Sequence, residues 1–106
     1  MKNFIPEYKA HVDRILLPIE NVTAGVMFGC PGYYTDQGLA VCHYNDNLFV
    51  KLPVETVQAL LRDDKNASAD GPMQPKRSMG KNWVFLHVPD MTALIGYSEL
   101  LRASVA

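Results

Sequence analysis

The stretch that decides the fold runs from Thr23 to Leu52, TAGVMFGCPGYYTDQGLAVCHYNDNLFVKL. Runs of β-branched and aromatic residues alternate in it with clusters of Gly, Pro, Asp and Asn, a pattern typical of short strands joined by tight turns. The first strand should stop at the breaker cluster 29–32, and turns are expected at 35–38, where Gly38 can accept a positive φ, and at 45–47. Short turns predict an antiparallel meander. The three expected strands cover 26–28, Leu39–Tyr44 and Leu48–Leu52.

Three helices and two further strands are expected around this meander. Apolar residues at steps of three and four predict the helices, and Pro6 and Pro53 suit the first turns of the first two. The polar segment 63–80 is long for a loop in a small domain, so we place a short edge strand at 73–76 within it. A stronger strand is expected at 82–88. The expected helices cover 6–17, 53–62 and 91–105.

This order of elements indicates a two-layer α+β fold, α-β3-α-β2-α, with a mostly antiparallel five-stranded sheet. At 106 residues the chain fits a single domain, 1–106. Its formal net charge of −1 creates no overall electrostatic field that would attract nucleic acid or an anionic membrane. No apolar run approaches the roughly 20 residues of a membrane helix, and the N-terminus lacks the apolar core of a signal peptide. We therefore expect a cytoplasmic protein in which Cys30 and Cys42 are reduced thiols.

Two of the expected strands are apolar on both faces. One face carries Leu48, Val50, Leu52, Val84, Leu86 and Val88. The other face carries Phe49, Lys51, Trp83 and Phe85. A sheet with one solvated face would instead alternate apolar and polar residues, and three short helices can cover only one face well. We therefore expect the second face to meet another copy of the chain, as a homodimer, or a different partner. A helix wrapped over this face is the alternative.

No group of residues has the spacing of a catalytic, metal or cofactor site. A cysteine-dependent enzyme remains an alternative because Cys30 lies in a Gly/Pro turn that could expose its thiol. Such a nucleophile needs a positioned base, and the sequence places none of His11, His43 and His87 near Cys30. Cys42 is expected to pack as a small hydrophobic residue. We therefore expect no enzyme activity, no metal and no cofactor.

The candidate contact residues are of two kinds. The protein-contact candidates are Phe28, Tyr33, Tyr34, Phe49 and Lys51. Of the two adjacent tyrosines, one ring should pack inward and the other should lie on the surface, where it can anchor a partner. The nucleic-acid candidates are Lys76, Arg77, Lys81 and Trp83, since cations beside an aromatic ring can grip phosphates and stack on a base. Because the chain is near neutral, we favour an unknown protein partner over nucleic acid, and we expect no membrane partner.

Several short motifs identify a family resemblance. They are MFGCPGYY (27–34), GLA (38–40), DNLFVKL (46–52), MQP (73–75), SM (78–79) and WV (83–84), with the closing helix. These motifs resemble the N-terminal domain of TfoX/Sxy proteins, in which an "MFG" strand end precedes an aromatic-rich turn, a small-residue strand and a strand that finishes with Lys or Arg. The resemblance extends from about residue 16 to 104 and departs from the family at 63–72, which is polar where relatives often have an aromatic residue before the proline.

The resemblance implies an α-β3-α-β2-α domain of the type III secretion-chaperone-like class, often dimeric, with no active site to carry over. Full-length TfoX proteins regulate natural competence and carry a second, helical domain at the C-terminus, which this chain does not include. The resemblance therefore implies a standalone, non-enzymatic domain that acts through protein contacts, with a regulatory role in competence or transcription implied by the resemblance alone.

Overall fold

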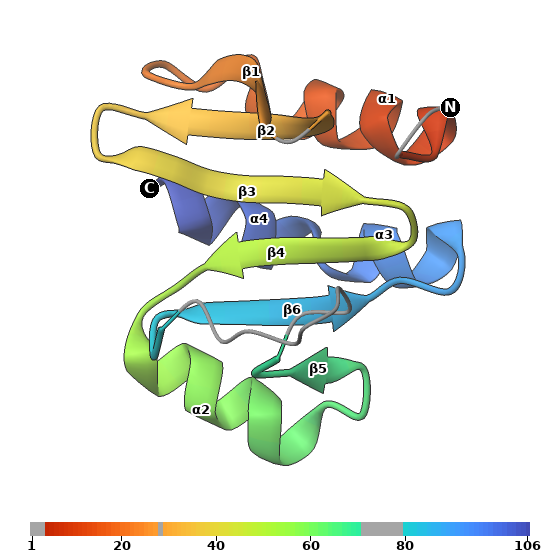
Figure 1. Cartoon of the computed structure of the whole chain (residues 1–106), viewed down its shortest axis with the longest axis vertical. Helices are drawn as coiled ribbons and strands as arrows, with labels where there is room; N and C mark the ends of the chain where they lie inside the picture. Colours follow the sequence, from red (N-terminus) through yellow and green to blue (C-terminus); the bar gives the residue numbers. More distant parts are fainter. Residues whose placement is uncertain (1–3, 28, 71–79) are drawn as a thin grey trace.

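The computed structural model describes residues 4–27, 29–70 and 80–106. These residues form an α+β fold with four helices and one six-stranded antiparallel sheet, whose strands lie in the order β1-β2-β3-β4-β6-β5 (Figure 1). The helices are α1 (Pro6–Leu16), α2 (Val54–Asp63), α3 (Met91–Gly96) and α4 (Ser98–Val105). The strands are β1 (Thr23–Met27), β2 (Cys30–Thr35), β3 (Gly38–Tyr44), β4 (Asn47–Lys51), β5 (Ala67–Ser68) and β6 (Trp83–His87). The expected α+β class and antiparallel sheet are confirmed.

The N-terminal meander has four strands, so the expectation of three strands here, and of five in the sheet, was wrong. The first strand ends before the cluster 29–32, since β1 stops at Met27, but Cys30, Pro31 and Gly32 are not a turn because β2 begins at Cys30 after Gly29, which has φ 78°. Gly25 and Gly32 lie opposite each other on β1 and β2 under the ring of Tyr34, and a Cβ on Gly25 would lie 2.8 Å from Tyr34 Cε1. These glycines therefore make room for an aromatic ring within the sheet.

The other two turns of the meander agree with the sequence. Gly38 has φ 106° next to the β2–β3 turn, and Asn45 has φ 52° in the β3–β4 turn. Both lie in the region of backbone conformation that glycine and asparagine adopt most readily. A bulge between Tyr33 and Tyr34 shifts the β2–β3 register, so that Ala40 and Val41 both pack into the core.

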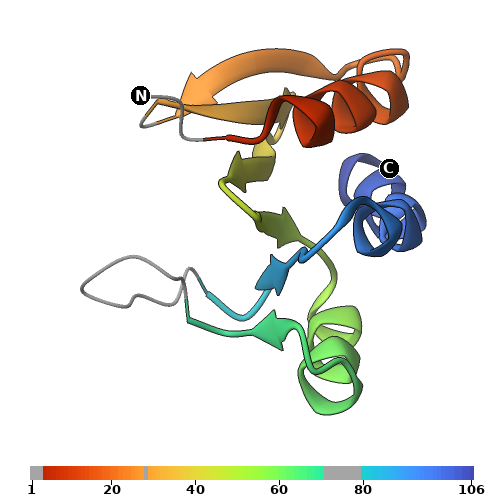
Figure 2. The ribbon, with the colours of Figure 1, turned by 90° about the vertical axis from the view of Figure 1, so that its right-hand side faces the viewer.

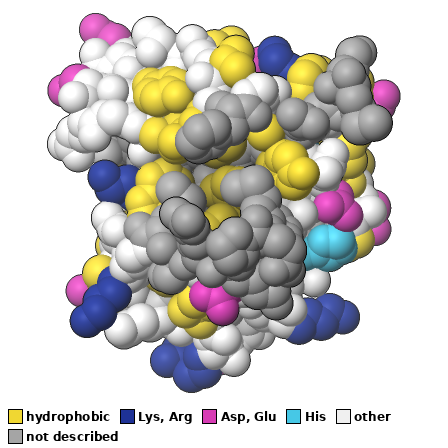
Figure 3. All heavy atoms as spheres, viewed as in Figure 1, with side chains coloured by type: hydrophobic (Ala, Val, Ile, Leu, Met, Phe, Trp, Pro, Cys, Tyr) yellow, Lys and Arg dark blue, Asp and Glu magenta, His cyan; other side chains and the backbone are white. Residues whose placement is uncertain are grey.

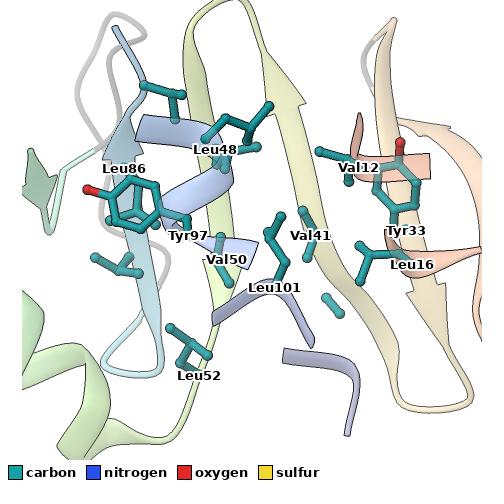
Figure 4. Close-up of a cluster of buried hydrophobic side chains, with 14 of the residues drawn as sticks. Val12, Leu16, Tyr33, Val41, Leu48, Val50, Leu52, Leu86, Tyr97 and Leu101 are labelled. Carbon is teal, nitrogen blue, oxygen red and sulfur yellow. The ribbon is translucent and has the colours of Figure 1, made fainter. Parts of the chain in front are cut away.

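All four helices lie on one side of the sheet (Figure 2). The main core forms between them and the strands, and its fully buried members come from every part of the chain (Figure 4). They include Val12, Leu16, Val41, Leu48, Val50, Leu86, Leu94 and Leu101, each with no exposed surface. The face expected to carry Leu48, Val50, Val84, Leu86 and Val88 is therefore the face that the helices cover.

Two core tyrosines, Tyr8 and Tyr33, direct their hydroxyl groups to polar partners on other elements. Tyr8 on α1 donates to the carbonyl oxygen of Val88 over 3.1 Å. Tyr33 on β2 donates to a carboxylate oxygen of Asp13 on α1, whose other oxygen accepts from Lys9 over 2.7 Å. Because each ring is buried and its hydroxyl is hydrogen-bonded, these residues join α1 to both ends of the sheet without leaving a buried polar group unsatisfied.

The helix expected at 91–105 is two helices, α3 and α4, because the helical conformation is interrupted at Tyr97. Tyr97 has φ −92° and ψ 5°, outside the helical range, and its amide donates to the carbonyls of Ala93 and Leu94. Its ring is 9% exposed and its hydroxyl donates to Asp64 over 2.7 Å. The break therefore lets Tyr97 reach a partner beyond α2. The start of α3 has a common N-cap, because the Asp90 side chain accepts a hydrogen bond from the Ala93 amide over 2.9 Å.

A short edge strand that the sequence did not predict, β5, lies at one border of the sheet. The predicted strand at 73–76 falls outside the described residues, whereas β5 occupies only Ala67–Ser68 and pairs with Leu86 and Phe85 of β6. The segment 63–70 is therefore not purely loop, although its sequence is polar. Asp64 and Asn66 hold this short strand in place through a hydrogen bond of 2.9 Å from the Asn66 amide to the Asp64 side chain.

Candidate interaction surfaces

The second face of the sheet carries a small apolar cluster with no described helix over it. Its buried members, each 5% or 6% exposed, are Cys30, Cys42, Phe49 and Phe85. The rings of Phe49 and Phe85 meet edge to face, with centroids 4.6 Å apart. Partly buried Leu39, Tyr44 and Trp83 pack against this cluster. In Figure 3 hydrophobic side chains gather over this face, and Lys and Arg side chains lie around its border.

The two thiols lie in this cluster and not in an exposed turn. Burial raises the pKa of Cys30, and burial followed by the nearby Cys30 thiol raises the pKa of Cys42 to about 11. A nucleophilic cysteine needs the opposite shift and a positioned base. Each thiol is 5% exposed, and the structure describes no disulfide at either residue. The surroundings of Cys30 therefore oppose thiolate chemistry.

We expect both thiols to react slowly with a thiol reagent in the native protein. In a stopped-flow assay with a disulfide reagent such as Ellman's reagent, the native rate should be at least about tenfold below that of the urea-unfolded chain, because the thiolate is both rare and covered. Single Cys30→Ser and Cys42→Ser variants assign the two rates. A Cys30 rate in the native protein equal to that of a free peptide thiol would restore the cysteine-enzyme alternative.

The three histidines lie apart. His11 on α1 pairs with Ser98 over 3.2 Å, and exposed His87 lies 3.7 Å from Asp46. His43 on β3 is fully buried on the helix-covered face, where it stacks on the Tyr8 ring with centroids 5.7 Å apart. Among residues 4–27, 29–70 and 80–106, no three His, Cys, Asp or Glu side chains form a group that could hold a metal ion.

The tyrosine pair divides as the sequence predicted. Tyr33 is 1% exposed and belongs to the main core, and burial together with its hydrogen bond to Asp13 raises its pKa. Tyr34 is partly exposed and lies over Gly25 and Gly32 near the edge of the second face. Of the pair, only Tyr34 can contact a partner. Phe28, the next aromatic candidate, lies outside the described residues.

Phe49 and Lys51 are placed differently from each other. Phe49 is 6% exposed in the single chain, so it supports the second face and offers a partner little surface. Lys51 is partly exposed at the end of β4, directly opposite Trp83 of β6 in the strand register. The structure therefore brings one protein-contact candidate and one nucleic-acid candidate together at the border of the second face.

The basic loop is described only in part, since Lys76 and Arg77 lie outside the described residues. Lys81 is exposed, and Trp83 is partly buried. Both line a shallow groove of about 280 Å³ between α2 and the start of β6, together with Val57, Gln58, Leu61, Ala69 and Gly80. Because most of this lining is apolar, Trp83 is placed to pack against side chains more than to stack on a row of bases.

The most exposed large hydrophobic residue among those described, Val26 at 74%, was not among the contact residues predicted from the sequence. Val26 lies on β1, which pairs with β2 on one side and borders the sheet on the other. The available signal was the absence of any charged residue from 21 to 35, in a chain with 20% charged residues. Ile95 on α3 is the next most exposed, at 55%.

The described helices are all too short or too polar to cross a membrane. Comparisons with protein-family models, with curated proteins and with solved structures found no match to this chain.

Proposed function

We propose that this chain is a non-enzymatic, TfoX-N-like interaction domain of the cytoplasm that works through protein contacts as a homodimer. The observation that carries the proposal is the contrast between its surface and its reactive groups. Val26 is 74% exposed on the uncharged strand β1, whereas the thiols are buried with raised pKa values. An exposed apolar side chain on an uncharged strand at the border of a sheet favours association with another protein surface. A regulatory role rests on the family resemblance alone.

The two parts of this proposal have separate tests. Sedimentation equilibrium of the purified chain should give twice the monomer mass of 11.8 kDa, with a dissociation constant in the micromolar range or below. Affinity capture of the tagged chain from its own cells, with and without nuclease, should retain a stoichiometric protein in both conditions. A protein lost on nuclease treatment would contradict direct protein contact.

The same capture tests the nucleic-acid alternative. Charge reversal at Lys76, Arg77 and Lys81 should leave the captured protein unchanged if protein contact is direct. A matched variant reverses three cations elsewhere, Arg14, Arg62 and Arg102, of which all three are exposed. Nucleic acid that copurifies with the chain and is lost only in the first variant would establish the nucleic-acid-associated regulator instead.

A further inference from the structure

One long edge of the sheet, β1, pairs on one side only among the described strands. β1 has five residues, and β2 is its one partner among the described strands (Figure 1). In an antiparallel ladder alternate residues direct their N–H and C=O groups to opposite sides, so β1 presents a row of these groups outward. Thr23, Ala24 and Val26 are all exposed along this edge.

This edge has none of the features that usually prevent strands from pairing between molecules. Soluble proteins protect such edges with charged side chains, prolines or very short strands. β1 has no charged residue and no proline, and the uncharged stretch extends from 21 through the whole of β2 to 35. The opposite edge differs, because β5 has two residues and is flanked by Lys65 and Asp70. The sheet therefore has one edge suited to pairing and one that is not.

The difference between the β1 and β5 edges indicates that the partner of β1 is the β1 strand of a second copy. An open-ended filament would require β1 to pair with a different edge of the next copy, and β5 is too short to serve. In a dimer with a twofold axis, β1 of one copy pairs with β1 of the other. Both suitable edges are then occupied, and no suitable edge is left for a further copy. Two β1 strands can also pair in antiparallel orientation without repulsion, since no like charges would face each other.

Building on the proposed homodimer, we infer that two copies join through antiparallel pairing of their β1 strands, with Gly25 at the twofold axis. The two sheets then form one continuous sheet of 12 described strands, twice the six of one chain. Val26 of each copy lies opposite Ala24 of the other on the helix-bearing face, which removes the 74% exposed Val26 side chain from water. Gly25 meets Gly25 beneath the two Tyr34 rings.

The first test places a charge on the edge. Val26→Lys should weaken dimerisation by at least about tenfold in sedimentation equilibrium, because each dimer would then bring two lysines near one strand pair. The matched control is Ile95→Lys, which makes the same change at an exposed apolar residue on α3 and should leave the dimer intact. Circular dichroism and the urea midpoint verify that both variants fold.

The second test is independent of that lysine. In the Ala24→Cys/Val26→Cys double variant, the new thiol at position 24 of one copy faces the new thiol at position 26 of the other. Mild oxidation should therefore give a covalent dimer in high yield. Each single variant should cross-link far less, because identical residues then lie diagonally. A wild-type dimer that Val26→Lys does not weaken, or that the double variant does not cross-link, overturns the β1 pairing and leaves the homodimer standing. A wild-type monomer overturns both, whereas the capture experiment still tests protein contact.

Discussion

Replacing Leu101 with alanine is expected to lower the free energy of unfolding by about 3 kcal/mol, within the range of roughly 2–5 kcal/mol for buried leucines. Leu101 has no exposed surface and lies at the centre of the core, between Val41 and Val50 of two neighbouring strands (Figure 4). Helix α4 contacts both β3 and β4, so a cavity here cannot close by moving one strand alone. The shift of the urea midpoint, followed by far-ultraviolet circular dichroism, measures the loss.

Ile95→Ala is the matched control for this prediction. It removes a side chain of the same size from the adjacent helix, but Ile95 is 55% exposed and should cost less than about 1 kcal/mol. Equal losses in the two variants would contradict the placement of α4 over the sheet centre. A change in the slope of the urea transition, in place of its midpoint, would indicate an altered denatured state.

Acidification is expected to destabilise the protein through His43. The Asn45 carbonyl accepts a hydrogen bond of 2.7 Å from Nε2, so Nε2 carries the proton of the neutral ring. Nδ1 is buried and has no hydrogen-bond partner among the described residues. Burial therefore lowers the pKa of His43, against smaller opposing effects of the Asn45 carbonyl and Asp46. Protonation would place a charged N–H among the aromatic rings of Phe4 and Tyr8.

The direction of the pH effect follows from this shift. The unfolded chain has the ordinary histidine pKa of about 6.5 and binds the proton first as pH falls. The free energy of unfolding should therefore decrease below about pH 6.5, by at most about 1.4 kcal/mol per pH unit from this group, until the folded-state pKa is reached. Above pH 7 the contribution of His43 is constant.

Urea unfolding at pH 7 and at pH 5 measures this effect against two variants. His43→Gln keeps a donor for the Asn45 carbonyl but cannot titrate, so its loss of stability between the two pH values should be smaller than that of the wild type. His11→Gln is the control. Burial, followed by the neighbouring Arg14 and Arg102, also lowers the pKa of His11, but His11 is partly exposed whereas His43 is fully buried. An unchanged pH dependence in His43→Gln would show that other groups cause the acid sensitivity.

The sequence by itself determined the elements whose signals are local. The runs of β-branched and aromatic residues at 39–44, 48–52 and 82–88 became β3, β4 and β6, and Pro6 and Pro53 mark the starts of α1 and α2. The positive φ of Gly38 was also predictable, because turn chemistry depends on neighbouring residues only. The inward position of one tyrosine of the pair followed from alternation, since adjacent strand residues face opposite sides.

Only the tertiary structure decided the features that depend on residues far apart in the chain. Gly32 was expected in a breaker cluster and Gly25 outside any strand, and only the structure places both in strands beneath the Tyr34 ring. At the break between α3 and α4, Tyr97 donates a hydrogen bond to Asp64, which lies 33 positions away. Phe49 was a candidate contact residue, but in the structure it is 6% exposed and packs in a cluster with Phe85. Which edge of the sheet stays open follows from the strand order, and that order places the uncharged segment 21–35 at the border.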